Sequence, residues 1–451
     1  MLKSSPFYGL FSVQAGCSVW SRCLFCLYFV YLVTSLTVPV MGKAAAGALL
    51  LMGLFGVYRL RQFFYPLVQA EKWLLASFAL FSVVSIVSFF YWPRNRLAQM
   101  HLEDYGTFLM LVPLYLLLRQ FKFNFILLFV LLTLAPILLG VVSISQYVAM
   151  KYFHTQIFIS ENTFSQIWLR PSGGVNPMRY GAISVILAAI SFNGILLLRH
   201  EAIWLKVVSA LAVTLGLVAC FLTQSRGGMV AVLVLSFVYG VYLYRTGYPK
   251  FLMLLIACSI VLVGVISQNY RVQKTMVNIV QYQNGDSNSS MGARLDMFKV
   301  ALILIKEKPI WGYGLNSYSP NATLIRENSK GMSREVGLWA NPHNEILQVM
   351  VEKGVIGLIT LLFVFVAPGF LFWRAFRRSD GSVSGRRVKY YSMSGLSLLI
   401  VYAVSGQSNA LFEHDIFNHF FTLMILLLAS QIRVIDYEEW EMSNKGCVRT
   451  V

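Results

Sequence analysis

The chain alternates long apolar segments with short polar ones. A helix needs about 20 apolar residues to cross a bilayer. Apolar runs of roughly this length lie near residues 22–40, 44–58, 73–92, 105–118, 123–148, 180–198, 203–222, 228–244, 251–267, 355–373, 390–410 and 416–432. The fourth run is short, contains Pro113 and follows Glu103 and Asp104. The pattern predicts an all-α, polytopic integral membrane protein with about twelve transmembrane helices.

The composition supports a membrane protein and excludes a soluble one. Of the 451 residues, 57% are hydrophobic and 12% are charged, against roughly 25% charged in globular proteins. The formal net charge is +18. In a membrane protein such an excess favours loops held against anionic lipids, and anionic ligands. We therefore expect membrane lipids as partners and no nucleic acid.

The basic residues predict the orientation in the membrane. If both termini are cytoplasmic, the inner segments carry 20 Lys and Arg, and the short outer segments carry seven. The positive-inside rule therefore assigns both termini to the cytoplasm. Ten further Lys and Arg lie in one long outer segment, residues 268–354. Long loops are translocated regardless of their charge.

The chain divides into three parts on this basis. Residues 1–267 form a membrane domain with spans 1–9, residues 268–354 form a large periplasmic loop with the catalytic segment, and residues 355–451 form spans 10–12 and a short cytoplasmic tail. A loop of this length in a protein that is otherwise nearly all membrane is unusual for a connector. Within it, residues 292–309 are typical of an amphipathic helix that ends at Pro309.

His343 is the candidate base in this loop. Asn341 is a good N-cap and Pro342 is suited to the first helical position, so we expect His343 in the first turn of a helix. The partial positive charge at a helix N-terminus disfavours imidazolium, so the ring should be neutral and able to accept a proton. The alternative is that His343 only packs at a turn near the membrane interface.

Arginines on the outer face are candidates for binding phosphate. Arg226 is followed by two glycines at the start of a helix, where free backbone N–H groups and a guanidinium suit phosphate. An arginine that reaches lipid headgroups from a helix end explains it about equally well. Arg170 and Arg179 flank a Ser-Gly-Gly turn, and Arg294 lies in the amphipathic helix. Four guanidiniums on one face suit a diphosphate.

We expect no metal and no cofactor. Metal-dependent transfer needs carboxylates around a divalent cation, and the chain contains no Asp-x-Asp. Glu413, His414 and Asp415, with His419 one turn later, form the one outer cluster that suits a metal, and a short polar turn between spans explains them at least as well.

Three segments together resemble the O-antigen ligase and polymerase superfamily of bacterial envelope enzymes. They are SRGG after a middle span, GARLDMFKVALILIKEKPIWGYGLNSY in the outer loop, and NPHNEILQVMVEKGVIGL before a late span. The resemblance covers about residues 165–360 and is greatest to the lipopolysaccharide O-antigen ligases. It implies a fold of the GT-C type in the bacterial inner membrane, with the active site on the periplasmic face.

The resemblance also implies the reaction. The enzymes it points to transfer a glycan from undecaprenyl diphosphate to the lipid A core, by a metal-independent and inverting reaction. Arg226, Arg294 and His343 match the family's catalytic residues, and Arg170 and Arg179 match its upstream motif. The hypothesis is that His343 deprotonates the acceptor while the arginines Arg170, Arg179, Arg226 and Arg294 hold the diphosphate. Alternatives are an O-antigen polymerase, a protein O-oligosaccharyltransferase and, from another class, a lipid-linked sugar transporter.

Overall fold

The computed structural model of the chain describes residues 18–60, 65–91, 96–155, 170–197, 202–268, 270–284, 286–329 and 331–448. Sixteen α-helices occupy these residues. They are α1 (Ser18–Thr34), α2 (Pro39–Leu60), α3 (Gln69–Phe89), α4 (Arg96–Met110), α5 (Val112–Leu118), α6 (Phe125–Tyr152), α7 (Pro177–Leu197), α8 (Ile203–Leu222), α9 (Arg226–Arg245), α10 (Pro249–Ser267), α11 (Tyr270–Gln283), α12 (Ser290–Glu307), α13 (Tyr318–Glu327), α14 (Glu345–Arg378), α15 (Val383–Ser405) and α16 (Asp415–Val448).

Each apolar run of the sequence lies largely in helix in the described residues, and the chain is a polytopic all-α membrane protein. In the part of the chain that the structure describes, eight helices are long and apolar enough to cross a membrane: α2, α3, α6, α7, α8, α9, α14 and α16. The fourth run is broken at Leu111 into α4 and the seven-residue α5. Pro113 falls in the first turn of α5, where its missing N–H breaks no helical hydrogen bond.

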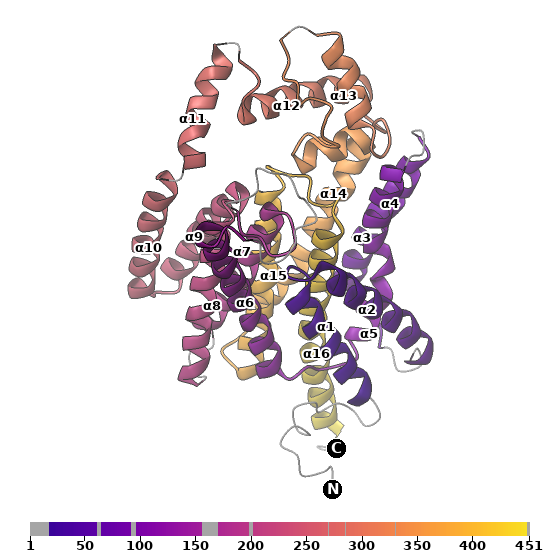
Figure 1. Cartoon of the computed structure of the whole chain (residues 1–451). Helices are drawn as coiled ribbons and strands as arrows, with labels where there is room; N and C mark the ends of the chain where they lie inside the picture. The colour runs from indigo at the N-terminus through magenta and orange to yellow at the C-terminus, as the bar shows by residue number, and fades with distance from the viewer. Residues whose placement is uncertain are drawn as a thin grey trace.

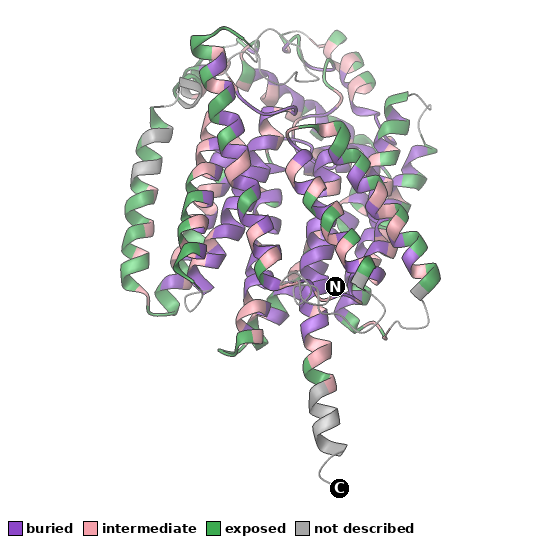
Figure 2. Ribbon diagram, turned by 60° about the horizontal axis from the view of Figure 1, so that its bottom comes forward, coloured by how far each residue is buried: buried purple, intermediate pink, exposed green. Residues whose placement is uncertain are grey.

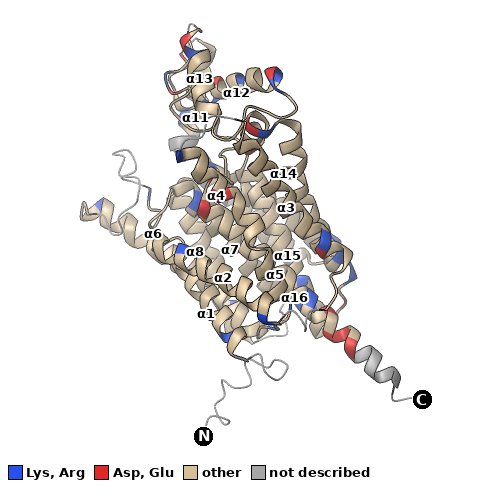
Figure 3. Cartoon of the chain, turned by 90° about the vertical axis from the view of Figure 1, so that its right-hand side faces the viewer, with Lys and Arg blue, Asp and Glu red and all other residues tan. Residues whose placement is uncertain are grey.

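The interior is formed around α7. Most side chains of α7 are buried, and the helix packs against α6, α8, α9 and α15 (Figure 1). In Figure 2 the buried residues follow the middle of the bundle, and the exposed ones follow its periphery. Exposed residues of α10 such as Met253, Leu254 and Ile260 are apolar. Figure 3 shows the charged residues mainly toward the two ends of the bundle. Both distributions fit a belt of lipid around the molecule.

The segment predicted as a large loop is mostly helical. It contains α11, α12, α13 and the first turns of α14, which lie together at one end of the molecule, while the C-terminal end of α16 lies at the other (Figure 1). The amphipathic helix expected over residues 292–309 is α12. The more polar residues that follow, 319–338, include most of α13, a helix that had not been predicted. A second, smaller core joins these helices through Met297, Val300, Tyr318, Val336 and Val351.

A kink in α14 connects this cap of helices to the bundle. Gly354 has φ of 60° inside α14, which splits the helix where the loop was predicted to end. The kink frees backbone groups, and the glycine-rich turn after α12 pairs with them. Gly314 donates to the carbonyl of Glu352 at 2.9 Å, and Val355 donates to the carbonyl of Pro309 at 2.8 Å. The turn and the start of α14 are therefore fixed relative to one another.

Candidate active site

His343 lies immediately before α14 and not in its first turn. Asn344, rather than Asn341, is the N-cap, and its side chain accepts from the backbone N–H of Leu347 at 3.1 Å. His343 has a left-handed backbone with φ of 54°. The prediction that placed Asn341 at the cap and Pro342 at the first helical position was wrong. Asn341 instead accepts from the backbone N–H of His343 at 3.0 Å.

The imidazole of His343 is neutral for a different reason from the expected one. The pKa of His343 is lowered to about 4. Burial is the largest cause and the positive charge of Arg294 adds to it, while a hydrogen bond to the side chain of Asn409 acts in the opposite direction. Removing a charged group from water disfavours its charged form. The ring is half-buried, and the indole of Trp339 lies 5.5 Å from it, centre to centre. At neutral pH the ring can therefore accept a proton.

Arg294 is placed near His343 by the start of α12. Ser289 caps this helix, because its hydroxyl accepts from the backbone N–H of Gly292 at 3.1 Å. The neighbouring residues Ala293 and Met297 are buried in the smaller core. Arg294 itself is half-buried. The sequence pattern predicts Arg294 and His343 on the same face of the membrane. In the structure the two residues lie within electrostatic range of each other.

Arg226 is the first residue of α9. Ser225 caps the helix and accepts from the backbone N–H of Gly228 at 3.4 Å. The two glycines were taken to favour a phosphate ligand, but they are points of close helix packing. A Cβ on Gly227 would lie 2.6 Å from the hydroxyl of Ser408, and one on Gly228 would lie 2.7 Å from the sulfur of Cys220. Phosphate binding at Arg226 would therefore depend on the guanidinium and the helix N-terminus.

Arg170 is hydrogen-bonded to the short turn between α8 and α9, just before Arg226. Its Nε donates to the carbonyl of Thr223 at 2.8 Å, next to the start of α9. The Ser-Gly-Gly turn that follows Arg170 is buried and fixed by Gln146, whose Oε1 accepts from the backbone N–H groups of Ser172 and Gly173 at 2.8 Å each. This turn therefore positions Arg170 beside the corner between α8 and α9.

Arg179 has acidic and imidazole neighbours. The pKa of Asp104 is raised to about 8. Burial is the largest cause and the charge of Asp415 adds to it, while the charge of Arg179 acts in the opposite direction. Burial also lowers the pKa of His414, and Arg179 lowers it further, followed by His101 and His343. Arg179 is thus within electrostatic range of α4 and of the residues that precede α16. Its surroundings differ from those of Arg170, although the two flank the same turn.

The segment between α15 and α16, residues 406–414, holds the site together. The carbonyl of Gly406 accepts from the backbone N–H of Glu345 at 2.8 Å, and the side chain of Asn409 is hydrogen-bonded to His343. Ser408 packs against Gly227, next to Arg226. One short segment therefore contacts the start of α9 and the start of α14. Asn409 was not predicted as a site residue, although it lies in a polar stretch between two apolar runs.

The metal cluster considered in the sequence does not form as described. Asp415 makes an ion pair with Lys43 at 2.7 Å. Glu413 instead faces His101 and Glu352, and its carboxylate lies 3.9 Å from Nδ1 of His101. Burial raises the pKa of Glu413, as do the charges of Glu352 and Glu345. Burial lowers the pKa of His101. His101 and Glu352 were missed because they are distant from Glu413 in the sequence.

Two comparisons with known proteins indicate what the chain is similar to. Residues 210–362 match a family model described as O-Antigen ligase. An uncharacterized protein of Haemophilus influenzae is 25% identical over 320 residues, which cover 67% of this chain and 73% of that protein. The matched family segment contains Arg226, Arg294 and His343, whereas Arg170 and Arg179 lie upstream of it. Residues 210–362 of the chain are therefore similar to the O-antigen ligase family.

Proposed function

We propose that this protein is an O-antigen ligase, which joins a glycan carried on undecaprenyl diphosphate to a sugar of the lipid A core on the periplasmic face of the inner membrane. The observation that carries the proposal is the family match over residues 210–362, because it spans Arg226, Arg294 and His343. The electrostatic effect of Arg294 on His343 supports a shared role for these two residues.

The departing group sets the first chemical requirement. When the bond between the anomeric carbon and the diphosphate oxygen breaks, negative charge grows on the diphosphate. Fixed guanidiniums in a site with little water stabilise this charge, so no metal is needed at the diphosphate. We assign this role to Arg226 and Arg294, with Arg170 and Arg179 as further binding residues. Both Arg226 and Arg294 are half-buried, which strengthens their interaction with an anion.

The incoming group sets the second requirement. A sugar hydroxyl is weakly acidic, so a positioned base accelerates its attack on the anomeric carbon. His343 takes this proton as the new C–O bond forms on the face opposite the diphosphate, which inverts the configuration. Its neutral ring and its hydrogen bond to the side chain of Asn409 suit this role. The backbone N–H of His343, bonded to Asn341, fixes the residue ahead of α14.

A gel of lipopolysaccharide from a deletion strain tests the assignment. If the protein is a ligase, the strain carries bare lipid A core and accumulates lipid-linked polymer, and the wild-type gene restores the ladder. Core with a single repeat would indicate a polymerase instead. A lipid-linked unit left on the cytoplasmic side would indicate a transporter, and loss of glycan from a periplasmic protein would indicate a protein O-oligosaccharyltransferase. A normal ladder would reject the ligase.

A further inference from the structure

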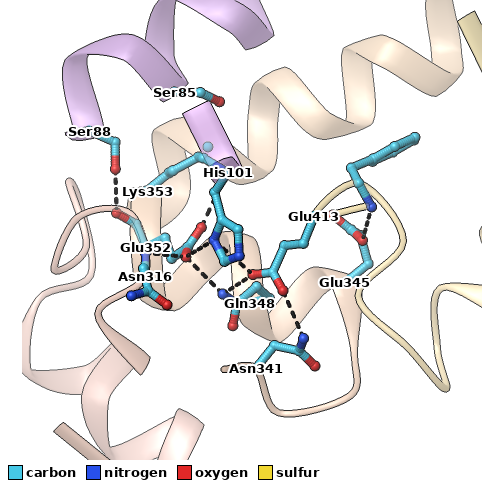
Figure 4. Close-up of polar contacts among 12 residues, drawn as sticks. Ser85, Ser88, His101, Asn316, Asn341, Glu345, Gln348, Glu352, Lys353 and Glu413 are labelled. Atoms are coloured by element: carbon cyan, nitrogen blue, oxygen red, sulfur yellow. Dashed lines mark hydrogen bonds and ion pairs between the residues drawn. The ribbon is translucent and has the colours of Figure 1, made fainter. Parts of the chain in front are cut away.

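A second polar site is buried next to Asn341, whose side chain contacts Glu413. Three side chains from three separate elements meet there: His101 of α4, Glu352 of α14 and Glu413 of the segment before α16. Nδ1 of His101 lies 3.9 Å from Oε1 of Glu352 and 3.9 Å from Oε1 of Glu413. All three atoms lie within 4.8 Å of one another. Figure 4 shows the imidazole of His101 directed between the two carboxylates.

The site carries more negative than positive charge. Glu345, Glu352 and Glu413 are each 4% exposed or less, and the side chain of Lys353, 3.5 Å from Glu352, is the buried ammonium beside them. Uncompensated charge in a low-dielectric interior is strongly destabilising. A divalent cation would balance three carboxylates and one ammonium.

Both facing carboxylates accept hydrogen bonds from donors of the protein. Glu352 accepts from the backbone N–H of Asn316 at 2.6 Å and from Nε2 of Gln348 at 2.8 Å. Glu413 accepts from Nδ2 of Asn341 at 2.7 Å and also from Gln348. All these groups donate, and the carboxylate oxygens only accept. A cation can bind these oxygens in addition to the donors, because a carboxylate oxygen has more than one lone pair.

His101 gives the independent indication of a ligand. It is 7% exposed, and its Nδ1 has no hydrogen-bond partner among the described residues. Buried polar atoms in native proteins nearly always have a partner. This atom points at the space between two carboxylate oxygens that are too far away, at 3.9 Å, to be hydrogen-bonded to it. A cation between the three atoms would satisfy the nitrogen and both oxygens.

We propose that His101, Glu352 and Glu413 bind one divalent transition-metal ion, of which Zn²⁺ is the best match and Mn²⁺ the next. One imidazole and two carboxylates form a ligand set that these ions take and Mg²⁺ seldom does. Tetrahedral bonds of about 2.1 Å put ligands about 3.4 Å apart, so the site closes by roughly half an ångström on binding. A half-turn of the Gln348 carboxamide would offer Oε1, which has no partner in the described part of the chain, as a fourth ligand.

The ion would have a structural role and take no part in the transfer. It would connect α4, α14 and the segment before α16, whereas the arginines assigned to the diphosphate, Arg226 and Arg294, lie on α9 and α12. This inference goes beyond the proposed function and stands or falls independently of it. Its readouts are metal content and ligand type, neither of which requires the reaction.

The test uses the full-length protein, purified in detergent with its affinity tag removed, stripped of metal, loaded with Zn²⁺ and desalted. We expect about one Zn²⁺ per chain by elemental analysis. His101→Gln and Glu413→Gln should each reduce this content at least tenfold. His154→Ala, which removes an exposed histidine, is the matched control and should retain the ion. Equal content in His101→Gln and the control would overturn the proposal.

X-ray absorption of the Zn²⁺-loaded wild type keeps the test independent of whether the variants fold. We expect one imidazole nitrogen with oxygen ligands, at about 2.0–2.2 Å. Sulfur ligands, two or more imidazoles, or no stoichiometric ion after loading with either Zn²⁺ or Mn²⁺ would each contradict the proposed site. In the last case protons, not a metal, balance the carboxylates.

Discussion

Asn341 links Glu413 to the candidate base. Its Nδ2 donates to Oε2 of Glu413 at 2.7 Å, and its Oδ1 accepts from the backbone N–H of His343 at 3.0 Å. The amide is buried, so both contacts are held in place. The position of His343 ahead of α14 therefore depends on Glu413, which lies in the segment before α16.

Asn341→Asp tests this link, because it keeps the shape of the side chain and replaces the donor to Glu413 with an oxygen. Two facing carboxylates repel, so the turn that carries His343 should shift. We expect kcat for glycan transfer to fall by about 10- to 100-fold, with a smaller change in the KM of the donor. Asn328→Asp, on the exposed end of α13, is the control. If both variants had the kcat of the wild type, Asn341 would have no positioning role.

The pH dependence of transfer tests the state of His343. Because its pKa is lowered to about 4, the imidazole stays neutral between pH 7 and pH 5. The acidic limb of kcat/KM, which reports groups of the free enzyme, should therefore have its midpoint near pH 4 to 5 and not near 6.5.

Arg294→Gln adds a directional check on the same limb. Removing the positive neighbour raises the pKa of His343, so the midpoint should move to higher pH. Arg334→Gln, which replaces an exposed arginine of the same loop, should leave the midpoint unchanged. A limb that stayed in place in Arg294→Gln would mean that another group controls it.

Arg226→Lys separates phosphate binding from a simple positive charge. A guanidinium can contact phosphate through two parallel N–H groups, whereas an ammonium cannot. We expect this variant to insert normally and to lose transfer by on the order of 10- to 100-fold. Arg334→Lys serves as the control here as well. Full activity of Arg226→Lys, measured at equal protein level in the membrane, would favour contact with lipid headgroups instead.

Gly354→Ala tests the kink in α14, which is paired with the glycine-rich turn after α12. A Cβ there would lie 2.2 Å from the carbonyl oxygen of Ile310, and the backbone has φ of 60°. Gly331 has φ of 82°, but a Cβ there would meet no described atom within 4 Å. Gly331→Ala therefore reports backbone strain alone, about 1–2 kcal/mol.

Gly354→Ala should cost at least about 3 kcal/mol, since the clash adds to the strain. The thermal midpoint in detergent, compared with that of Gly331→Ala, measures the difference. Equal midpoints would show that α14 accommodates the side chain and that close contact with the turn is not needed.

Local patterns predicted the helices well because each apolar run is continuous. The end of α12 before Pro309 was also predictable, because proline cannot continue a helix. The start of α14 was not. In Asn341-Pro342-His343-Asn344 both asparagines are good caps, and local preference does not choose between them. The choice is made by Glu413, 72 residues along the chain from Asn341, which engages the first asparagine and leaves Asn344 to cap the helix.

The site was predictable only in part for the same reason. Arg226, Arg294 and His343 stand in recognisable local motifs. His101, Glu352 and Glu413 have no such motif, because their meeting depends on how α4 and α14 pack. Likewise, the glycines after Arg226 suggested a ligand, whereas the structure uses them to let α9 approach its neighbours.

The most direct test of the central claim is the initial rate of glycan transfer by purified His343→Ala, given undecaprenyl-diphosphate-linked donor and lipid A core acceptor. Loss of a general base should reduce the rate by about 10²- to 10⁴-fold, while His154→Ala retains the rate of the wild type. A near-normal rate for His343→Ala, in protein that is folded and inserted, would contradict the assignment of this histidine as the base.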